Sequence, residues 1–350
     1  MKAAFLTGLR KIEIRDAPEP ALRSPTDVLL AVDVVGVCGS DMHYYKAGRI
    51  GCQIVEYPWI VGHECAGRVL EVGDRVTRVR PGDRVAVDPL IICGRCDQCR
   101  IGHVHTCRNQ AFLGCPGQLQ GSMCERLVMP EGSCFRIPDA MSLTQATLCE
   151  PFSIALWAAK LADPQPGSKI AILGSGPIGL TVLAACKLAA PDCTVYQTDL
   201  LPGRMTMAER LGAAWTGKAD EIDPVAEISR AEPLGLDIVI ECVGDQETID
   251  QCLELVRPCG KVVIVGIPEG DRLSFEMNHM RRKEIRLQNV RRQLDQVDRA
   301  IELIAGGRVN LDALVTHEFS FEQSQEAYDL VADYRDGVVK AMIRLGEDVA

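Results

Sequence analysis

The stretch KIAILGSGPIG, from Lys169 to Gly179, decides the fold of this 350-residue chain. Five residues of strand character, Lys169 to Leu173, run directly into a G-x-G-x-x-G pattern, and the text that follows reads as a helix. In such a unit the first glycine allows a tight turn, the second lets a pyrophosphate approach the backbone, and the third lets helix and strand pack closely. The helix N-terminus then faces the phosphates. The stretch therefore predicts a dinucleotide site, whose candidate contacts are Gly174, Gly176, Pro177, Ile178 and Gly179.

A carboxylate follows at the spacing that a dinucleotide site uses for the ribose. The next strand-like run, Thr194 to Thr198, ends at Asp199, twenty residues beyond Gly179. A carboxylate there accepts hydrogen bonds from both ribose hydroxyls and repels a 2′-phosphate, so it favours NAD over NADP. The alternative is an aspartate that only caps a helix or faces solvent. Arg204, on the following helix, is expected beside the adenosine.

The pattern around this stretch predicts two domains of an α/β protein. From Lys169 onward, strand-like runs alternate with helices, as in a doubly wound parallel sheet. The sequence before this region consists of short β-type runs broken by turns. The C-terminal tail does not continue the alternation of strands and helices. We predict a β-rich domain over residues 1–155 and 291–350 and a dinucleotide-binding domain over residues 156–290.

Composition narrows the classes of partner. The chain has 38 basic and 48 acidic side chains and a formal net charge of −10, which argues against binding to nucleic acid or anionic lipid. The longest strongly apolar uncharged run, Ile170 to Cys186, is shorter than the roughly 20 residues of a membrane helix and contains glycine and proline. The N-terminus has no signal-peptide core. We expect a cytoplasmic protein that binds small molecules.

Four of the 16 cysteines form a metal-binding pattern. Cys93, Cys96, Cys99 and Cys107 are spaced C-x2-C-x2-C-x7-C in a loop with glycines, which favours tetrahedral zinc in a lobe of about residues 93–107. An iron–sulfur centre shares the first spacing but places its fourth cysteine closer and follows it with proline. A shell of four thiolates has no open position, so this ion would be structural. The histidines at 103 and 105 are expected to be exposed loop residues.

A second set of metal ligands is mixed in chemistry. Cys38 opens Cys-Gly-Ser-Asp-Met-His, and Gly62-His63-Glu64 follows in another turn. Each residue alone is more often a core thiol, a structural histidine or a solvated charge. Together, a thiolate, an imidazole and a carboxylate leave a fourth position for water or substrate, as in a catalytic zinc site.

In this order, the two metal patterns and the glycine pattern resemble the zinc-dependent medium-chain dehydrogenases over almost the whole chain. The resemblance is closest to their sorbitol (polyol) dehydrogenase branch, through the text HYYKAGRIG from His43 to Gly51, Glu150-Pro151, and LVTH from Leu314 to His317. It implies a GroES-like β-rich catalytic domain into which a Rossmann domain is inserted.

The resemblance also implies roles for individual residues. The implied ligands of the catalytic zinc are Cys38, His63, Glu64 and Glu150. The implied proton relay consists of Ser40 and His43, and the implied substrate contacts are Tyr44 and Arg292. His43 could equally shape the cofactor pocket, and Arg292 could orient a loop through an ion pair. Gln293 stands where the branch usually has tyrosine. Further cofactor contacts are implied at Val243, Val265, Gly266, Val290 and Arg291.

The expected protein is a zinc-dependent oxidoreductase with two zinc ions per chain, one catalytic and one structural. It would transfer a hydride from a secondary hydroxyl of a polyol or sugar alcohol to NAD⁺. Alternative substrates are cyclic polyols, aldoses and threonine-like amino alcohols, and the non-enzyme alternative is a redox-sensing protein that binds zinc and NAD. The resemblance further implies a homodimer or homotetramer, paired through Rossmann edge strands around residues 261–275.

Overall fold

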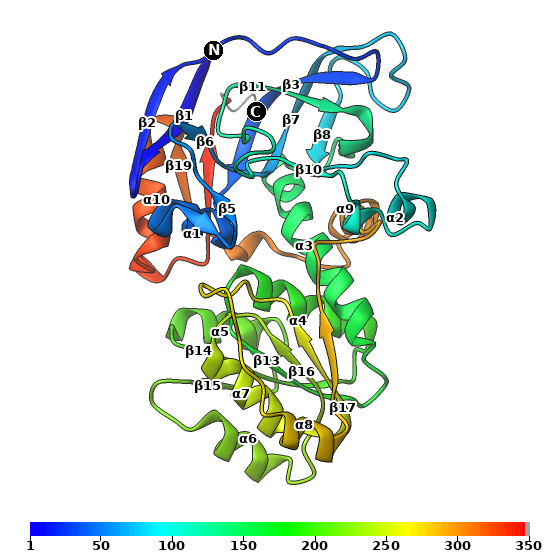
Figure 1. Ribbon diagram of the computed structural model, residues 1–350, viewed down its shortest axis with the longest axis vertical. Helices are drawn as coiled ribbons and strands as arrows, with labels where there is room; N and C mark the ends of the chain where they lie inside the picture. The colour runs from blue at the N-terminus through cyan, green and yellow to red at the C-terminus, as the bar shows by residue number, and fades with distance from the viewer. Residues whose placement is uncertain (347–350) are drawn as a thin grey trace. The chain divides into compact units, whose positions relative to one another are not determined.

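The structure, a computed structural model, describes residues 1–346 and divides them into two compact units. Among the described residues, unit 1 comprises 1–150 and 297–346, and unit 2 comprises Pro151–Gln296. Unit 2 is therefore a continuous segment inserted into the chain of unit 1, and Figure 1 shows the two units with their elements labelled.

Unit 1 is built around a seven-stranded sheet in the order β12-β8-β7-β3-β20-β19, with β11 also paired to β3. Its central strand β3 has buried Val and Leu side chains, as expected of the middle of a core. The strands of this sheet are β3 (Asp27–Gly36), β7 (Glu64–Val72), β8 (Arg84–Val87), β11 (Arg126–Pro130), β12 (Cys134–Arg136), β19 (Val315–Ser320) and β20 (Lys340–Arg344).

Smaller sheets and short helices complete unit 1. A three-stranded sheet has the order β2-β1-β6, and two two-stranded sheets pair β4 with β5 and β9 with β10. These strands are β1 (Lys2–Gly8), β2 (Lys11–Asp16), β4 (Arg49–Ile50), β5 (Gln53–Ile54), β6 (Trp59–Ile60), β9 (Leu90–Ile91) and β10 (Ala111–Phe112). The helices are α1 (Gly39–Ala47), α2 (Asp97–Arg100), α9 (Val297–Ala305) and α10 (Ser324–Ala332), with 3₁₀ turns at Val104–Thr106, Glu131–Ser133, Asp312–Leu314, Phe321–Gln323 and Arg335–Gly337.

Unit 2 contains a six-stranded parallel sheet in the order β15-β14-β13-β16-β17-β18. This order reverses direction at β13, the strand that leads into the glycine pattern, and it is the doubly wound order predicted from the sequence. The strands are β13 (Lys169–Leu173), β14 (Thr194–Asp199), β15 (Trp215–Lys218), β16 (Leu236–Glu241), β17 (Val256–Ile264) and β18 (Arg286–Asn289). The helices packed against them are α4 (Pro177–Ala189), α5 (Pro202–Arg210), α6 (Pro224–Ala231), α7 (Gln246–Leu255) and α8 (Met277–Lys283).

A long helix, α3 (Leu143–Ala162), was not predicted. It begins at a capping box in which Gln145 N donates to Ser142 Oγ at 3.1 Å and Ser142 N donates to Gln145 Oε1 at 3.0 Å. The sequence obscured this helix because Pro151 stands inside it and usually ends a helix. Glu150 is thereby carried on a helix turn, not in a loop.

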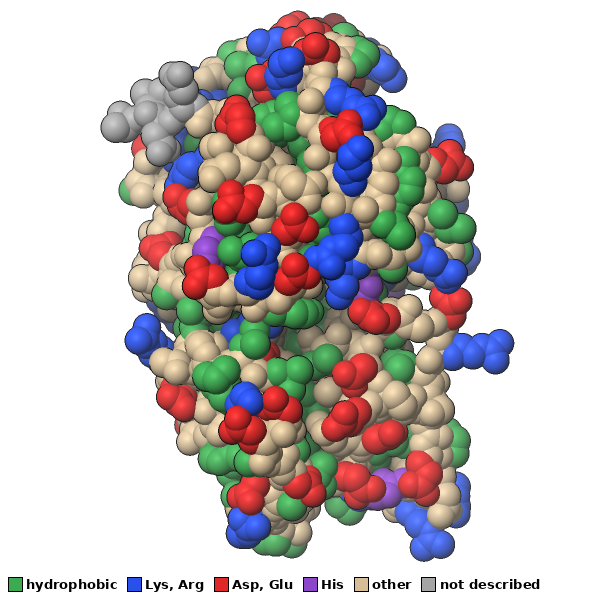
Figure 2. Space-filling model, turned by 90° about the vertical axis from the view of Figure 1, so that its left-hand side faces the viewer, with side chains coloured by type: hydrophobic (Ala, Val, Ile, Leu, Met, Phe, Trp, Pro, Cys, Tyr) green, Lys and Arg blue, Asp and Glu red, His purple; other side chains and the backbone are tan. Residues whose placement is uncertain are grey.

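The sheet of unit 2 has β15 at one edge and β18 at the other. The expected pairing segment around residues 261–275 begins in β17, but β17 lies between β16 and β18, so that expectation is wrong for this strand. Figure 2 shows acidic and basic side chains interspersed over one face of the molecule. Among residues 1–346, no helix has the length and apolar character required to cross a lipid bilayer.

Candidate active site and metal centres

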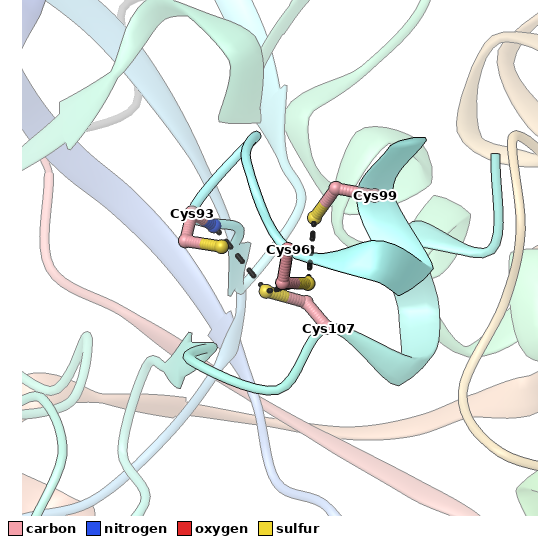
Figure 3. A group of neighbouring side chains, drawn as sticks. All are labelled: Cys93, Cys96, Cys99 and Cys107. Atoms are coloured by element: carbon pink, nitrogen blue, oxygen red, sulfur yellow. Dashed lines mark hydrogen bonds between the residues drawn. The ribbon is translucent and has the colours of Figure 1, made fainter. Parts of the chain in front are cut away.

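The four-cysteine loop brings its sulfur atoms together. One ligand atom from each of Cys93, Cys96, Cys99 and Cys107 lies within 4.8 Å of the others. Figure 3 shows the four side chains converging from the turn before α2, from α2 itself and from the segment after the 3₁₀ turn. Cys96 Sγ lies 3.5 Å from Cys99 Sγ and 3.9 Å from Cys107 Sγ. This closed set of soft ligands fits a tetrahedral zinc ion.

Backbone amides favour the thiolate form of two of these four cysteines, whereas burial raises the pKa of Cys99. The N–H groups of Arg95 and Cys96 lower the pKa of the Cys93 thiol to about 6. The backbone at Arg108 and Cys99 lowers the pKa of Cys96 in the same way. Because a metal ion is bound by the thiolate, these amides prepare the loop for zinc. Of the two neighbouring histidines, the one at 103 is exposed as expected, whereas the one at 105 is buried, so that expectation is wrong.

The second set of ligands converges through strand pairing. Cys38 precedes α1 at the end of β3, and His63 immediately precedes β7, whose first residue is Glu64. In the antiparallel pair of β3 and β7, Gly36 lies opposite Glu64. This register places one ligand atom each of Cys38, His63 and Glu64 within 4.8 Å of the others. Sulfur, nitrogen and oxygen donors with three protein ligands fit a catalytic zinc site.

Asp41 supports this triad and was missed in the sequence. Its Oδ1 lies 3.4 Å from His63 Nδ1, and its Oδ2 accepts a hydrogen bond from Cys38 N at 3.2 Å. A carboxylate on one ring nitrogen orients the other toward a metal. Burial alone would lower the pKa of His63, but Asp41 and Cys38 outweigh burial and raise it well above its usual value. The signal available was the aspartate three residues after Cys38.

Lys340 also lies beside the triad, and no pattern in the sequence predicted this position. Its ammonium forms an ion pair with Glu64 Oε2, and both side chains are 1% exposed. Burial lowers the pKa of Lys340, but the charges of Glu64 and Cys38 outweigh burial and raise it.

Glu150 and Ser40 lie close to the triad. Glu150, on α3, is 8% exposed, and burial raises its pKa to about 8, with His63 opposing the shift and Glu64 adding to it. It is not among the converging ligand atoms, so its role as a zinc ligand stays a prediction. Ser40, in the first turn of α1, donates a hydrogen bond to Cys38 Sγ at 3.3 Å.

The helix α1 also carries the two other predicted residues of this region. His43 is partly buried, and Tyr44 is 5% exposed. The Tyr44 hydroxyl oxygen lies 3.3 Å from Gln53 Oε1 and 3.8 Å from Cys115 Sγ, and it can donate its one proton to either. Tyr44 is therefore held in place by neighbours on two other segments of unit 1.

The glycine pattern of unit 2 has the geometry predicted for it. Gly174 has φ +99°, and a Cβ atom there would lie 2.9 Å from Val243 Cγ2. A Cβ on Gly179 would lie 2.0 Å from the Gly174 carbonyl oxygen, so helix and turn pack too closely for a side chain. By contrast, the nearest neighbour of a Cβ on Gly176 would be Arg204 Nη1 at 3.7 Å. Space is thus left beside the middle glycine, where a pyrophosphate approaches in this type of site.

Asp199 lies at the carboxyl end of β14, beside the glycine turn. Its Oδ2 accepts a hydrogen bond from Ser175 N at 2.6 Å, and its Oδ1 accepts one from Leu201 N at 2.9 Å. Arg204 Nη1 lies 4.0 Å from Asp199 Oδ2. The carboxylate therefore joins the two loops that would flank a bound nucleotide.

The remaining predicted cofactor residues follow the carboxyl ends of neighbouring strands, where ligands bind in doubly wound sheets. Val265 N and Gly266 N donate to the Glu241 carbonyl at 2.9 and 3.1 Å. Val243, Val290, Arg291 and Arg292 follow β16 and β18, and Arg292 has φ +52°. Glu241 was missed: its buried carboxylate accepts hydrogen bonds from Val243 N and Gly244 N, both at 2.7 Å.

Comparisons with known proteins agree with both units. Residues 24–139 match the family model of the alcohol dehydrogenase GroES-like domain, and residues 177–306 match that of zinc-binding dehydrogenases. The chain is 38% identical over 344 residues to sorbitol dehydrogenase of Bacillus subtilis (strain 168), covering 98% of this chain and 97% of the relative.

Two further relatives cover nearly the full length. L-idonate 5-dehydrogenase of Vitis vinifera is 35% identical, with 98% of this chain and 94% of the relative covered. The solved structure of a presumed zinc-binding dehydrogenase from Sinorhizobium meliloti 1021, bound to NADP, is 31% identical with a TM-score of 0.88 and covers 98% of this chain and 99% of that one.

The chain belongs to the zinc-containing medium-chain alcohol dehydrogenase family. Within it, the chain is an NAD(P)-dependent zinc alcohol dehydrogenase that acts on CH–OH groups, with a structural zinc site in the four-cysteine loop and a catalytic-type ligand set at Cys38, His63 and Glu64.

Two separable zinc ions follow from the two ligand sets. Metal analysis of the purified protein should give two equivalents, and Cys96→Ser and Cys38→Ser should each retain one. Only Cys96→Ser should lower the melting temperature markedly, by roughly 5 °C or more, because the structural ion stabilises the fold of its lobe. A parent protein with one equivalent that Cys96→Ser leaves unchanged would contradict the structural assignment.

Proposed function

We propose that the protein oxidises a secondary hydroxyl of a polyol or sugar alcohol with NAD⁺ as hydride acceptor. The observation that carries the proposal is the Cys38, His63 and Glu64 triad, with the buried carboxylate of Glu150 close by. Such a polar, charged surrounding suits a substrate with several hydroxyls better than a simple alkyl alcohol. The 38% identity to a sorbitol dehydrogenase supports the same substrate class.

The chemistry divides between the zinc ion and the side chains of unit 1. Zinc, when bound, supplies Lewis-acid polarisation of the substrate hydroxyl. His63 is held in one orientation by Asp41. The hydroxyl proton must leave as the hydride passes to the nicotinamide, and Ser40 and Glu150 are the groups assigned to accept or relay it. The products are a ketone, NADH and one proton.

Substrate contacts are assigned to Tyr44 and Arg292. Tyr44 is fixed by its contacts with Gln53 and Cys115. Arg292 has a left-handed backbone, which costs free energy for a residue with a side chain and often occurs at functional positions. A guanidinium donates several hydrogen bonds in a fixed fork, which suits neighbouring hydroxyls.

A substrate panel tests this proposal through formation of reduced nicotinamide. Linear polyols should be oxidised with far higher kcat/KM than ethanol. Arg292→Ala should reduce kcat/KM for vicinal polyols by roughly ten- to a hundredfold and spare a one-hydroxyl alcohol, because only the polyol loses hydrogen bonds. Arg281→Ala, an exposed arginine on α8, is the matched control.

The panel separates the alternatives. Equal losses on both substrates would assign Arg292 to loop orientation. Preference for cyclic polyols, aldoses or threonine-like amino alcohols would replace the substrate class, and NAD binding without turnover of any alcohol would favour a redox sensor.

We propose a preference for NAD on the basis of Asp199. Family membership does not determine the cofactor, because one relative is bound to NADP. Asp199 also accepts hydrogen bonds from Ser175 and Leu201, so Asp199→Asn is the sharper variant, because it retains an acceptor oxygen and removes the charge. NADP⁺ use should rise relative to NAD⁺ by about tenfold or more, as expected for a change of one charge-assisted contact. Equal use of both cofactors by the parent protein would refute the assignment.

We propose a homodimer or homotetramer and a cytoplasmic setting. The edge strand β18 has no strand partner on its outer side within residues 1–346, and an open edge of this kind favours pairing with another chain. The cysteines of both metal sites are free thiols, which a reducing compartment favours.

Light scattering at micromolar concentration should give the mass of two or four chains. Val290 N donates to the Ile264 carbonyl of β17, so with the alternation along the strand the N–H of Leu287 faces the open edge. Replacing Leu287 with proline removes a backbone donor from this edge and should shift the population toward smaller species. A monomeric mass for the parent protein would contradict the assembly.

A further inference from the structure

Lys340 is a lysine whose side chain is almost completely removed from solvent. It is the first residue of β20 and is 1% exposed. Burying an ammonium group costs a large free energy unless a partner of opposite charge compensates it. A lysine in this position therefore needs a specific electrostatic reason.

Its contacts link both segments that carry the zinc ligands. The ammonium pairs with the carboxylate of Glu64 and donates a hydrogen bond to the Val37 carbonyl oxygen at 3.0 Å, one residue before Cys38. Strand pairing fixes the backbone around it, because Val37 N donates to the Ala341 carbonyl at 3.0 Å. The lysine thus has one contact on each ligand segment.

The space around the pair is closely filled. A Cβ atom on Gly36 would lie 2.4 Å from Glu64 Oε2 and 3.1 Å from Lys340 Cε. The Glu64 carboxylate is therefore confined between β3 and the lysine. Two positive groups can interact with its charge: the Lys340 ammonium, and a cation in the site that Glu64 shares with Cys38 and His63.

Charge balance indicates what the lysine does. With Cys38 as thiolate and with Asp41, Glu64 and Glu150 as carboxylates, the site would hold four negative charges around one divalent cation. The ammonium halves the remaining net negative charge, from −2 to −1, and withdraws part of the Glu64 charge from the cation. Electrostatic competition of this kind is strong in a buried site, where the effective dielectric constant is low.

On the basis of the zinc assignment above, we propose that Lys340 is a positioning residue that competes with the catalytic zinc for the carboxylate of Glu64. It keeps Glu64 a weak, exchangeable ligand and so leaves a coordination position for the substrate hydroxyl. A purely structural lysine would act in the opposite direction, since its loss would loosen the site and the metal.

The test measures zinc release to a colorimetric chelator from the fully loaded protein. Lys340→Met retains most of the side-chain length without the charge, and it should release the catalytic zinc about tenfold more slowly than the parent. Lys261→Met is the matched control: Lys261 donates to the carbonyls of Leu161 and Ala162 in unit 2, and its loss should leave the release rate unchanged.

Removing the Glu64 carboxylate completes a double-mutant cycle with Lys340. Glu64→Gln should release zinc faster than the parent, and Lys340→Met should add no further effect in that background. Visible spectra of the cobalt-exchanged proteins should show an altered ligand field for Lys340→Met but not for the double variant relative to Glu64→Gln. If the single lysine variant does not fold, the comparison of Glu64→Gln with the double variant remains decisive.

The outcomes separate this inference from the proposed function. Unchanged or faster zinc release from folded Lys340→Met, or a further effect of that change in the Glu64→Gln background, overturns the role of Lys340. A parent protein that binds zinc only in the four-cysteine loop instead overturns the zinc assignment itself.

Discussion

The antiparallel pairing of β3 with β7 is the constraint on which the active site depends. Cys38 lies beyond the end of β3, and Glu64 begins β7 opposite Gly36. A slip of one residue in this register would turn Glu64 to the other face of the sheet and separate the triad. The surrounding core of unit 1 therefore has a chemical as well as a stabilising role: it holds three ligands at a distance that no local turn could maintain.

The two zinc sites obtain their ligands in different ways, and this difference matches their roles. The four cysteines come from one short loop, whose own amides lower the pKa of Cys93 and Cys96. The catalytic-type ligands come from separate segments and depend on Asp41 and Lys340 for orientation and charge. A locally closed site is stable and inert, whereas a site assembled from distant segments can keep an open position.

Local patterns explain what the sequence could predict. The glycine pattern after β13, the cysteine spacing and the alternation of strands and helices are properties of short windows, and the fold class inferred from them is confirmed. The helix α3 was missed because Pro151, a residue that usually ends a helix, stands inside its otherwise apolar, helix-like sequence. Lys340 could not be found, because its partner Glu64 lies 276 positions earlier and only the sheet order joins them. Asp41 belongs to the motif that begins at Cys38, but the sequence assigns it no role, because its contact with His63 is visible only in the structure.

The discontinuity of unit 1 has a consequence for how the protein forms during synthesis. Unit 2 is one continuous segment, so all its residues have left the ribosome before β20, an internal strand of the unit 1 sheet, is made. Domains that are complete generally fold as units while translation continues. Unit 2 can thus fold early, whereas Glu64 has no ammonium partner until Lys340 is translated. A chain truncated before β20 would consequently retain every residue of unit 2 but lack the ammonium that pairs with Glu64.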